Sequence, residues 1–389
     1  MSRKLHIAVG IPSFEEADSI AHVTEQVDIG LTQLATSADC IIINADGGSL
    51  DGTSDVFLST PTVCSKLSLI TPGHIGKGSN VLSLLEYCRD HDVDALALID
   101  GDIRSLTPAW PIALTRSILS GEADYVAPNY RRRRFEGATT NHFAYPLLRS
   151  YFGRGIRQPI GGEFGLSTAL IKYLLDQPIE RETMGYGIDI FMSMHAVAGG
   201  FAIAQADLGS KLHKPSFRKA PRIFPDVAAT AFRVARRYPM NAGVGYSESV
   251  SIGIDDTPGG LDEEDVRLAI SESLERIEAL MPVYEEWLGK TPVEMTAELR
   301  THTPFLSAGV WAELAASCAV CAILAPTADD SRLFAAQLFP AFRLRSISFI
   351  RDHRDSRPEV VEAEIEFQRN IFGETLRGRM SQGRNPNSA

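Results

Sequence analysis

Short apolar runs separated by helical patterns dominate the first part of the chain. Helical segments are expected to begin near Ala17, Thr53 and Lys77. The runs typical of buried strands lie between them and beyond them, at residues 6–11, 40–44, 66–70, 95–99 and 125–127. Strands that alternate with helices in this way predict a mainly parallel, doubly wound α/β sheet. Ligands of such sheets bind at the carboxyl ends of the strands, so the residues after each run are the candidates for chemistry.

The second part of the chain is predicted to be helical. Apolar residues recur every three or four positions between 261 and 288, at Ile270, Leu274, Ile277, Met281, Tyr284 and Leu288. Such a stripe is typical of an amphipathic helix that packs within its own chain, and a homodimer interface is its other use. Further helices are predicted at residues 308–324, 331–338 and 358–372. We therefore expect an α/β domain at residues 1–225, a helical domain at 226–377 and a flexible tail at 378–389.

Composition narrows the class of protein. With 44% hydrophobic and 22% charged residues, the chain is typical of a globular protein, and its formal net charge of −11 argues against nucleic acid as a partner. We expect no signal peptide, because the N-terminus enters a strand at once, and no membrane span, because the longest apolar stretch, at 315–325, is too short. A cytoplasmic location follows. The odd number of cysteines suits a reducing compartment, and Cys318 and Cys321 are predicted to be buried in a helix rather than to bind zinc.

Two carboxylates follow the apolar run at residues 95–99. Asp100 and Asp102 flank Gly101 at the point where a parallel strand leaves the sheet. Mg²⁺ or Mn²⁺ prefers oxygen ligands and commonly takes one or two carboxylates from the protein and the rest from substrate phosphates. A plain turn is the alternative, since Asp and Gly favour turns for conformational reasons alone. The pair marks a candidate metal site.

The ends of the first two runs carry groups suited to a nucleoside. Pro12 is expected to stop the first strand, and Glu15 and Glu16 beyond it can accept hydrogen bonds from a ribose or a base. Asp46, after the second run, can accept a hydrogen bond from an imino group of a base. The alternative for the glutamates is a favourable place in the first turn of a helix, and residues 49–53 are also typical of a helix cap.

A glycine-rich turn places Lys77 at the start of a predicted helix. Gly76 and Gly78 flank the lysine. A helix N-terminus and an ammonium group that face the same way attract a diphosphate. The spacing is not that of a Walker A loop, and a surface lysine in a turn is the alternative.

These motifs together resemble a known superfamily. Pro-x-x-x-Glu at 12–16, Asp-x-x-Ser-x-Asp-x-Thr at 46–53 and Asp-x-Asp at 100–102 form the pattern of glycosyltransferases with the GT-A fold. The resemblance implies a Rossmann-like GT-A catalytic domain, followed here by an α-helical C-terminal domain that covers the acceptor side or forms a dimer.

Three later segments make the resemblance more specific. In their order and spacing they are similar to the retaining glucosyl-3-phosphoglycerate synthases and mannosylglycerate synthases. The segments are Pro-Ile-Gly-Gly-Glu at 159–163, Gly-Tyr-Gly-Ile-Asp at 185–189 and Asp-Leu-Gly-Ser-Lys-Leu-His at 207–213. The similarity covers roughly residues 5–220.

The resemblance implies roles for single residues. Asp102 and His213 would ligate Mg²⁺ or Mn²⁺, with Asp100 supporting the metal or the nucleotide. Asp189 matches an acidic residue near the sugar and the acceptor, and with Lys77 it would take part in catalysis. The residues that would bind the nucleotide-sugar donor are Pro12, Glu16, Asp46, Lys77, Asp100, Gly101, Gly162 and Glu163.

The acceptor side departs from the pattern. The relatives hold an acceptor phosphate with an Arg-x-Thr motif, whereas this chain keeps Thr140 but has Ala138 in place of the arginine. An asparagine that usually follows the metal-binding histidine is also missing after His213. The basic run at 131–134 is a candidate replacement, because guanidinium groups bind phosphate or carboxylate with two donors, and a solvated basic loop is the alternative. The predicted acceptor-binding residues are Thr140, Arg131, Arg133 and Gly161.

The resemblance implies transfer of glucose or mannose, with retention, from UDP-glucose or GDP-mannose to a small anionic acceptor such as glycerate or 3-phosphoglycerate. The product would be a compatible solute such as glucosylglycerate. The alternatives are a different sugar or lipid acceptor, a sugar-phosphate nucleotidyltransferase, and a non-catalytic nucleotide-sugar binder. A nucleotidyltransferase should carry a basic, glycine-rich fingerprint after the first strand, and residues 11–16 have none. A non-catalytic binder is expected to lose its metal ligands, yet the candidate ligands are present.

Overall fold

The chain forms two compact units, which we describe separately. The first consists of Met1–Arg131 with Gln158–Ser216, and the second of Arg132–Arg157 with Phe217–Ala389. The computed structural model describes residues 4–34, 38–71, 73, 75–133, 136–214, 219–240, 254–255 and 262–383. The sequence predicted one boundary between residues 225 and 226, whereas the observed division falls after residue 216 and groups residues 132–157 with the helical unit.

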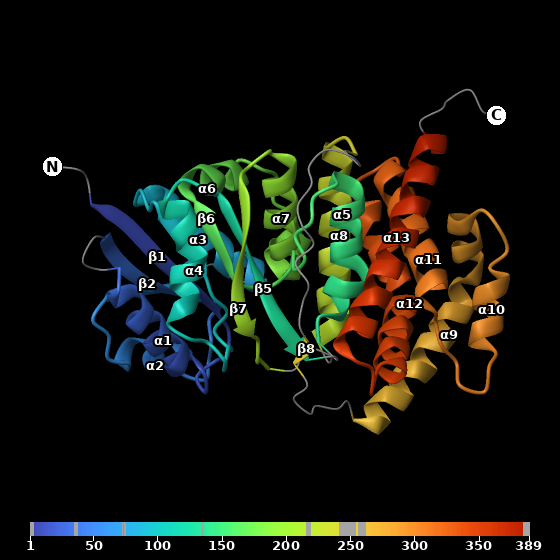
Figure 1. Ribbon diagram of the computed structural model, residues 1–389, viewed down its shortest axis with the longest axis horizontal. Helices are drawn as coiled ribbons and strands as arrows, with labels where there is room; N and C mark the ends of the chain where they lie inside the picture. The colour runs from blue at the N-terminus through green and yellow to red at the C-terminus, as the bar shows by residue number, and fades with distance from the viewer. Residues whose placement is uncertain are drawn as a thin grey trace. The chain divides into compact units, whose positions relative to one another are not determined.

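The first unit is built on a twisted, mainly parallel sheet, as the sequence predicted (Figure 1). Its strand order is β3-β2-β1-β4-β6-β5-β7. All neighbouring strands run parallel except β6, which is antiparallel to both β4 and β5. The strands are β1 (Leu5–Ser13), β2 (Ala38–Asp46), β3 (Ser65–Ile70), β4 (Ala95–Leu98), β5 (Tyr125–Arg133), β6 (Phe164–Ser167) and β7 (Ile203–Ser210).

Helices cover both faces of this sheet. On one face, Ile7, Val9 and Ile11 of β1 cluster with apolar residues of α1, α2 and α4. On the other face α3 lies against β1 and β2, so closely that a Cβ added at Gly10 would stand 2.8 Å from Cδ1 of Leu84. The helices are α1 (Ile20–Thr32), α2 (Thr53–Ser59), α3 (Lys77–Asp90), α4 (Ala109–Leu119), α6 (Thr168–Leu175) and α7 (Ile188–Ala198), with a π-helical turn η2 (Thr183–Gly187) before α7. Successive residues of a strand are buried on opposite faces, and burial stabilises the fold by about 1.5–3 kcal/mol for each large aliphatic side chain. This burial fixes the register of the sheet.

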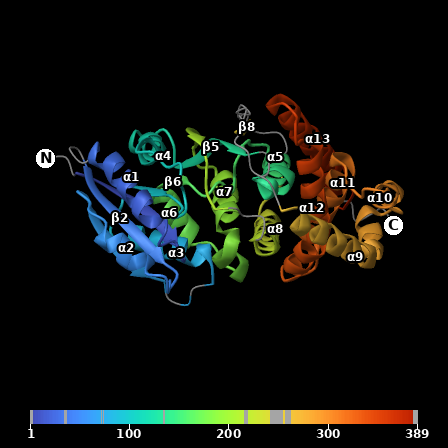
Figure 2. The ribbon, with the colours of Figure 1, turned by 90° about the horizontal axis from the view of Figure 1, so that it is seen from below.

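The second unit is helical, and α8, α11, α12 and α13 lie side by side in both views (Figures 1 and 2). Its elements are η1 (Thr140–Ala144, a π-helical turn), α5 (Tyr145–Phe152), α8 (Ala220–Arg237), β8 (Ile254–Asp255), α9 (Glu263–Leu288), α10 (Val293–Leu299), α11 (Ala308–Leu324), α12 (Asp330–Asp352) and α13 (Pro358–Gly383). The predicted stripe of α9 includes the buried residues Ile277, Tyr284 and Leu288. Among the described residues, no helix combines the length and the apolar character that crossing a membrane requires.

Two helices of this unit are longer than the sequence predicted. α12 continues past residue 338 through Pro340 to Asp352, and its second half contains the buried residues Leu344 and Ile347. α13 continues to Gly383, so residues 378–383 are helical and not part of a tail. Met380 is buried there. Burial of its apolar side chain favours continuation of the helix, whereas the polar composition of the segment had predicted a tail. The rest of the predicted tail lies outside the described residues.

A buried polar network joins α12, α13 and η1. Arg345, 1% exposed, donates hydrogen bonds to Glu364 and to Oε1 of Gln368. Nε2 of His353 lies 2.9 Å from Oε2 of Glu364, and Nδ1 of His142 lies 3.0 Å from Oε1 of Gln368. Burial lowers the pKa of His142 to about 3, so its ring is neutral. Burial opposes ionisation of Glu364, but the bond to His353 and the charge of Arg345 outweigh it and lower the pKa of Glu364 to about 2.

A second ion pair holds the segment that follows η1. Arg157 is 3% exposed, and its Nε and Nη2 donate to the two carboxylate oxygens of Glu362 at 3.0 and 2.9 Å. Its Nη1 donates to Oδ1 of Asn141 at 3.0 Å, and its guanidinium carbon lies 4.8 Å from the ring centroid of Tyr145. Bidentate geometry of this kind makes a strong, directional cross-link.

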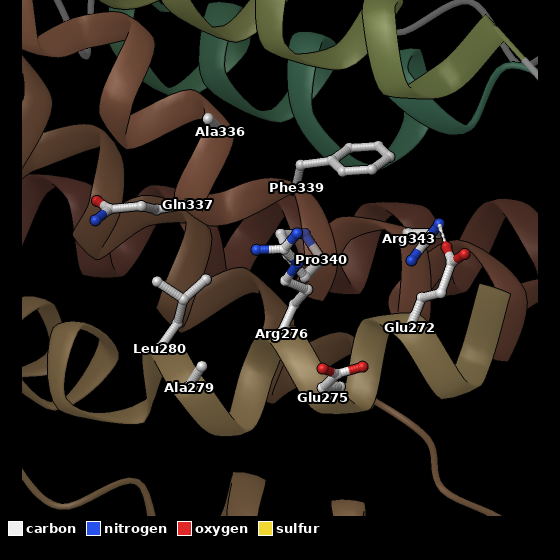
Figure 3. A pocket seen from close by; sticks show the side chains of 10 residues that line it. All are labelled: Glu272, Glu275, Arg276, Ala279, Leu280, Ala336, Gln337, Phe339, Pro340 and Arg343. Carbon is white, nitrogen blue, oxygen red and sulfur yellow. Dashed lines mark hydrogen bonds and ion pairs between the residues drawn. The ribbon is translucent and has the colours of Figure 1, made fainter.

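The helical unit also contains a surface groove between α9 and α12, with a volume of about 600 Å³ (Figure 3). Arg276 and Phe339 line it, and Nη1 of Arg343 at one end donates to Oε2 of Glu272 at 2.8 Å. None of the residues that the sequence singled out for chemistry lines this groove.

Candidate active site

The predicted donor residues gather at the carboxyl ends of β1, β2 and β4. Pro12 does not stop the first strand, because β1 continues to Ser13 and Pro12 pairs in register with Ala45 of β2. The carbonyl of Gly10 accepts from the backbone of Ile99 on the β4 side, and alternate residues of a strand face the same side. The backbone nitrogen of Pro12 therefore points toward β4, which has already ended at this level. Its missing N–H costs the sheet no hydrogen bond.

Glu16 is buried beside the metal-binding candidate Asp102. Nζ of Lys214 donates to Oε2 of Glu16 at 2.6 Å, and Oγ of Ser19 donates to the same oxygen at 3.2 Å and to the carbonyl of Gly101 at 2.9 Å. Burial raises the pKa of Glu16, the bond from Lys214 lowers it, and the charge of Asp102 raises it. The loops after β1 and β4 are thus joined through the hydroxyl of Ser19.

Asp46 organises the loop after β2. It is 2% exposed, and its carboxylate accepts hydrogen bonds from the backbone and hydroxyl of Ser49 at 2.8 and 2.7 Å and from the hydroxyl of Ser54 at 2.6 Å. The hydroxyl of Ser49 also accepts from the backbone N–H of Glu15 at 2.8 Å. The geometry gives Asp46 a local structural task, and its contact with a base stays a prediction.

Lys77 is the first residue of α3 and lies between two carboxylates. Its Nζ is 2.8 Å from Oδ1 of Asp100 and 3.2 Å from Asp189, which is in the first turn of α7. The close approach of α3 to η2 depends on Gly78, since a Cβ there would stand 1.9 Å from the carbonyl oxygen of Thr183. Burial alone would lower the pKa of Lys77, but Asp100 and Asp189 outweigh it and raise the pKa, so the ammonium is fully charged.

Asp100 contacts a second, deeply buried lysine. Nζ of Lys211 is 3.6 Å from Oδ2 of Asp100 and 2.8–2.9 Å from both carboxylate oxygens of Glu163. Gly162 has a φ of +102°, and a Cβ there would stand 2.3 Å from Oδ2 of Asp100, so only glycine fits. Burial alone would raise the pKa of Asp100, but Lys77 and Lys211 outweigh it and hold the pKa below its usual value.

Carboxylates outnumber ammonium groups in this cluster, which consists of Lys77, Asp100, Glu163, Asp189 and Lys211. Burial raises the pKa of Glu163 and of Asp189, and their lysine partners offset that only in part. A diphosphate would bring further negative charge to this cluster. A cation or protons must accompany it, because buried charges of one sign are costly when they are not compensated.

Asp102 and His213 each lie close to a carboxylate of the donor side. Asp102 acts on the pKa of Glu16, and His213 acts on that of Asp100. Nδ1 of His213 lies 2.6 Å from the carbonyl oxygen of Lys214, and since a carbonyl only accepts, Nδ1 carries the proton. The Nε2 lone pair of such a tautomer is the group with which histidine binds a metal.

The three predicted metal ligands are nevertheless not assembled as a set. Within the described ranges, the structure gathers no group of three or more His, Cys, Asp or Glu side chains that could hold a metal ion. Asp100 is bound to two lysines instead. A hard cation that takes several of its ligands from a diphosphate needs only one or two from the protein, and Asp102 with His213 offers donors of the right kind.

The acceptor candidates belong to both units. Arg131 is exposed, and its Nε lies 3.4 Å from the hydroxyl of Ser210. β5 continues to Arg133, so Arg131 and Arg133 lie on a strand, and the solvated loop that was the alternative is not formed at these two residues. Residues 129–131 pair with β7, and Arg132 and Arg133 pair with Ile254 and Asp255 of β8. Gly161 belongs to the first unit, and Arg133 and Thr140 to the second. Thr140 is 3% exposed at the start of η1, and Arg134 lies outside the described residues.

Sequence reasoning did not single out two lysines of this site. Lys211 and Lys214 stand on either side of the predicted ligand His213, and both contact carboxylates of the donor side. A signal for Lys211 was present in the sequence, because it stands two residues before the predicted ligand His213. The partner of Lys211 depends on strand order, which the sequence does not give.

No family model and no curated protein matches this chain. Solved structures do match. One is glucosyl-3-phosphoglycerate synthase from Mycobacterium tuberculosis in complex with Mn²⁺, UDP and phosphoglyceric acid, at 23% identity, with 66% of this chain and 82% of that chain covered and a TM-score of 0.48. The same enzyme with Mg²⁺ and UDP matches at 24% identity, 66% and 83% coverage and a TM-score of 0.48. A further match is a mycobacterial protein, at 26% identity, 64% and 80% coverage and a TM-score of 0.47.

Proposed function

We propose that this chain is a metal-dependent glycosyltransferase of the GT-A type that uses a nucleoside diphosphate sugar. The observation that carries the proposal is the placement of Lys77. Its ammonium lies at the N-terminus of α3, between Asp100 and Asp189, at the carboxyl edge of a parallel sheet. A helix N-terminus and a buried ammonium together suit a diphosphate, and the neighbouring carboxylates suit a sugar.

The nucleoside would bind along the ends of β1 and β2. Glu16 would accept hydrogen bonds from the ribose, with Lys214 fixing its carboxylate. Asp46 would shape the loop that contacts the base, because three internal donors already hold its side chain. Pro12 and Gly101 would let the backbone approach the nucleotide closely.

Asp102 and His213 would hold Mg²⁺ or Mn²⁺. When bound, the cation supplies positive charge that stabilises the departing diphosphate. The donor set fits such a cation, since it joins a carboxylate to an imidazole whose Nδ1 is fixed by the carbonyl of Lys214.

Lys77 and Asp189 would act at the bond that breaks. Lys77 would donate hydrogen bonds to the leaving diphosphate, and its charge is assured because its pKa is raised. Asp189, released from Lys77, would hold hydroxyl groups of the sugar or the acceptor. With attack from the face of the leaving group the anomeric configuration is retained, which requires an acceptor held close to the diphosphate.

The acceptor is proposed to be small and anionic, such as glycerate or 3-phosphoglycerate, and the donor to be UDP-glucose or GDP-mannose. The support is the exposed guanidinium group of Arg131 on β5. Gly161 would contact the acceptor through its backbone.

A donor and acceptor screen tests the proposal. UDP-glucose and GDP-mannose are each incubated with glycerate or 3-phosphoglycerate and with Mn²⁺ or Mg²⁺, and release of UDP or GDP is measured together with the glycosylated product. We expect one donor to be used, with release abolished by EDTA and restored by added Mn²⁺. Transfer at an unchanged rate in EDTA would contradict the proposed metal dependence. The absence of transfer from both donors would contradict the proposed reaction.

A further inference from the structure

Lys211 makes more contacts with the site than a simple ion pair with Glu163 requires. It follows the last residue of β7 and is 3% exposed. Its Nζ donates to both carboxylate oxygens of Glu163 and, at 2.8 Å, to the carbonyl of Gly161. The ammonium also lies 3.6 Å from Oδ2 of Asp100 and 5.3 Å from the ring centroid of Tyr130. One side chain therefore joins the exits of β7 and β4 to the turn before β6.

The first task of this ammonium is to balance Glu163. That carboxylate is 0% exposed, and burial raises its pKa. Removing one partner of a buried ion pair leaves an uncompensated charge, which is strongly destabilising, whereas removing both can be nearly neutral. A structural pair of this kind would need nothing more than Glu163.

The contact with Asp100 goes beyond that task. Asp100 has two cations, Lys77 and Lys211, and Lys77 also contacts Asp189. A diphosphate that draws Lys77 away would leave Lys211 as the cation that holds Asp100 in place. The absence of a side chain at Gly162 brings the turn and Asp100 close enough for this arrangement.

Resting on the function proposed above, we propose that Lys211 is a positioning residue of the donor site. It fixes Asp100 and the turn Gly161–Glu163 as one rigid group, so that the carboxylate of Asp100 keeps its orientation when the diphosphate engages Lys77. The residue does not touch the reacting atoms, and its effect acts through Asp100.

The test separates positioning from charge balance. In the double variant Lys211→Met with Glu163→Gln, both charges of the buried pair are gone, so we expect a melting temperature within a few degrees of the wild type. Binding of UDP in the presence of Mn²⁺, measured by calorimetry, is expected to weaken about tenfold, which corresponds to about 1.4 kcal/mol. Wild-type affinity in this variant would reduce Lys211 to a partner of Glu163 and overturn the proposal.

A mutant cycle tests the path through Asp100. Asp100→Asn is expected to weaken UDP binding strongly in the wild type but little in the double variant, because residues that act together are not additive. Equal weakening in both backgrounds would overturn the proposal. If the double variant does not fold, Lys211→Arg keeps the charge and changes the geometry, so positioning predicts weaker UDP binding and wild-type binding would again overturn it.

Lys66→Met is the matched control. Lys66 also donates to backbone carbonyls, those of Phe57 and Thr60, but it lies on β3 and contacts no carboxylate of the site. Its variant is expected to change the melting temperature and not the affinity for UDP. These measurements do not require sugar transfer. If the wild type binds UDP with the predicted dependence on Lys211 and Asp100 but transfers no sugar, the proposed function is wrong and the positioning role of Lys211 still holds.

Discussion

The two units each bury a group of charged side chains, and the groups differ in how well their charges are matched. In the helical unit, Glu364 pairs with Arg345 and His353, and the bond to His353 and the charge of Arg345 outweigh burial and lower the pKa of Glu364 to about 2. In the α/β unit, burial instead raises the pKa of Glu163 and Asp189, although Lys211 and Lys77 contact them.

The difference indicates different tasks. A matched, bidentate pair such as Arg157 with Glu362 cross-links the segment after α5 to α13, and a ligand would not stabilise it further. A group with surplus carboxylates at the open edge of a sheet is stabilised when a cation or a hydrogen-bond donor binds beside it. Perturbed carboxylates of that kind are typical of functional sites. Changes in the α/β group should therefore affect turnover, and changes in the helical group should affect stability.

The largest expected effect is that of Lys77→Met. Its loss removes the hydrogen bonds and the charge that would stabilise the leaving diphosphate, so kcat/KM should fall by about a thousandfold. The fold should remain, because Asp189, whose pKa is already raised, can take up a proton in place of its lysine partner. Initial rates of UDP release and urea unfolding of the same preparation check both points, and a loss of stability in proportion to activity would remove the distinction between the units.

The converse change is Arg157→Met in the helical unit. It leaves Glu362 and Asn141 without their guanidinium partner, and the free energy of unfolding should fall by about 3 kcal/mol. The affinity for UDP should not change. Arg369→Met is the control, since Arg369 forms a partly exposed pair with Glu366 on the same helix and should contribute only about 0.3 kcal/mol. Equal effects of the two changes on urea unfolding would show that the Arg157 pair is not a special cross-link.

The pH dependence of stability sharpens the comparison further. The pKa of Glu364 is about 2 in the folded protein against 4.5 as the ordinary value, so its carboxylate stabilises the fold above pH 4.5 and this contribution is lost as the pH falls toward 2. The loss should amount to roughly 2 kcal/mol, since the side chain is partly exposed. Urea unfolding between pH 7 and pH 3 measures it.

Glu364→Gln is the matched variant for that curve. It should remove the additional fall below pH 4.5 and leave the fall that runs from near pH 6.5 to about pH 3, because neutral His142, with a pKa of about 3, resists a proton that the unfolded chain accepts. An unchanged dependence of the unfolding free energy on pH in this variant would show that groups other than Glu364 cause the acid sensitivity.

The smallest effect is expected at Arg131. Its side chain is exposed, so Arg131→Ala should leave stability and the KM for the donor unchanged. The KM for an anionic acceptor should rise several-fold, because an exposed guanidinium contributes only modestly to anion binding. Steady-state kinetics with each substrate varied in turn measures this, and Arg104→Ala, another exposed arginine of the same unit, is the control. An acceptor KM equal to that of the control would reduce Arg131 to a solvated residue.

Sequence patterns predicted those parts of the fold that local periodicity determines. Short apolar runs placed β1 to β4, and the motif at Lys77 was correctly placed at the start of α3. The antiparallel strand β6 was not predicted, because its short run gives no direction. Pro12 was predicted to end β1, and only the early end of β4 explains why it does not.

The same limit applies to the site. Strand ends brought Glu16, Asp46 and Asp100 to one edge, as parallel topology requires. The link from Lys211 to Glu163 depends on β6 lying between β4 and β5, a long-range fact that no local pattern contains. The acceptor residues are the least determined part, because the motif that would hold a phosphate has changed in this chain.

Asp102 gives the most direct test of the central claim, that the edge formed by β1, β2 and β4 is a metal-dependent donor site. The rate of UDP or GDP release from the preferred donor is measured at saturating Mn²⁺ for the wild type and for Asp102→Ala, with the melting temperature of both recorded. We predict a fall of at least about a thousandfold in the variant at an unchanged melting temperature, because the charge on the leaving diphosphate is no longer stabilised. Turnover by Asp102→Ala at the wild-type rate would contradict the account.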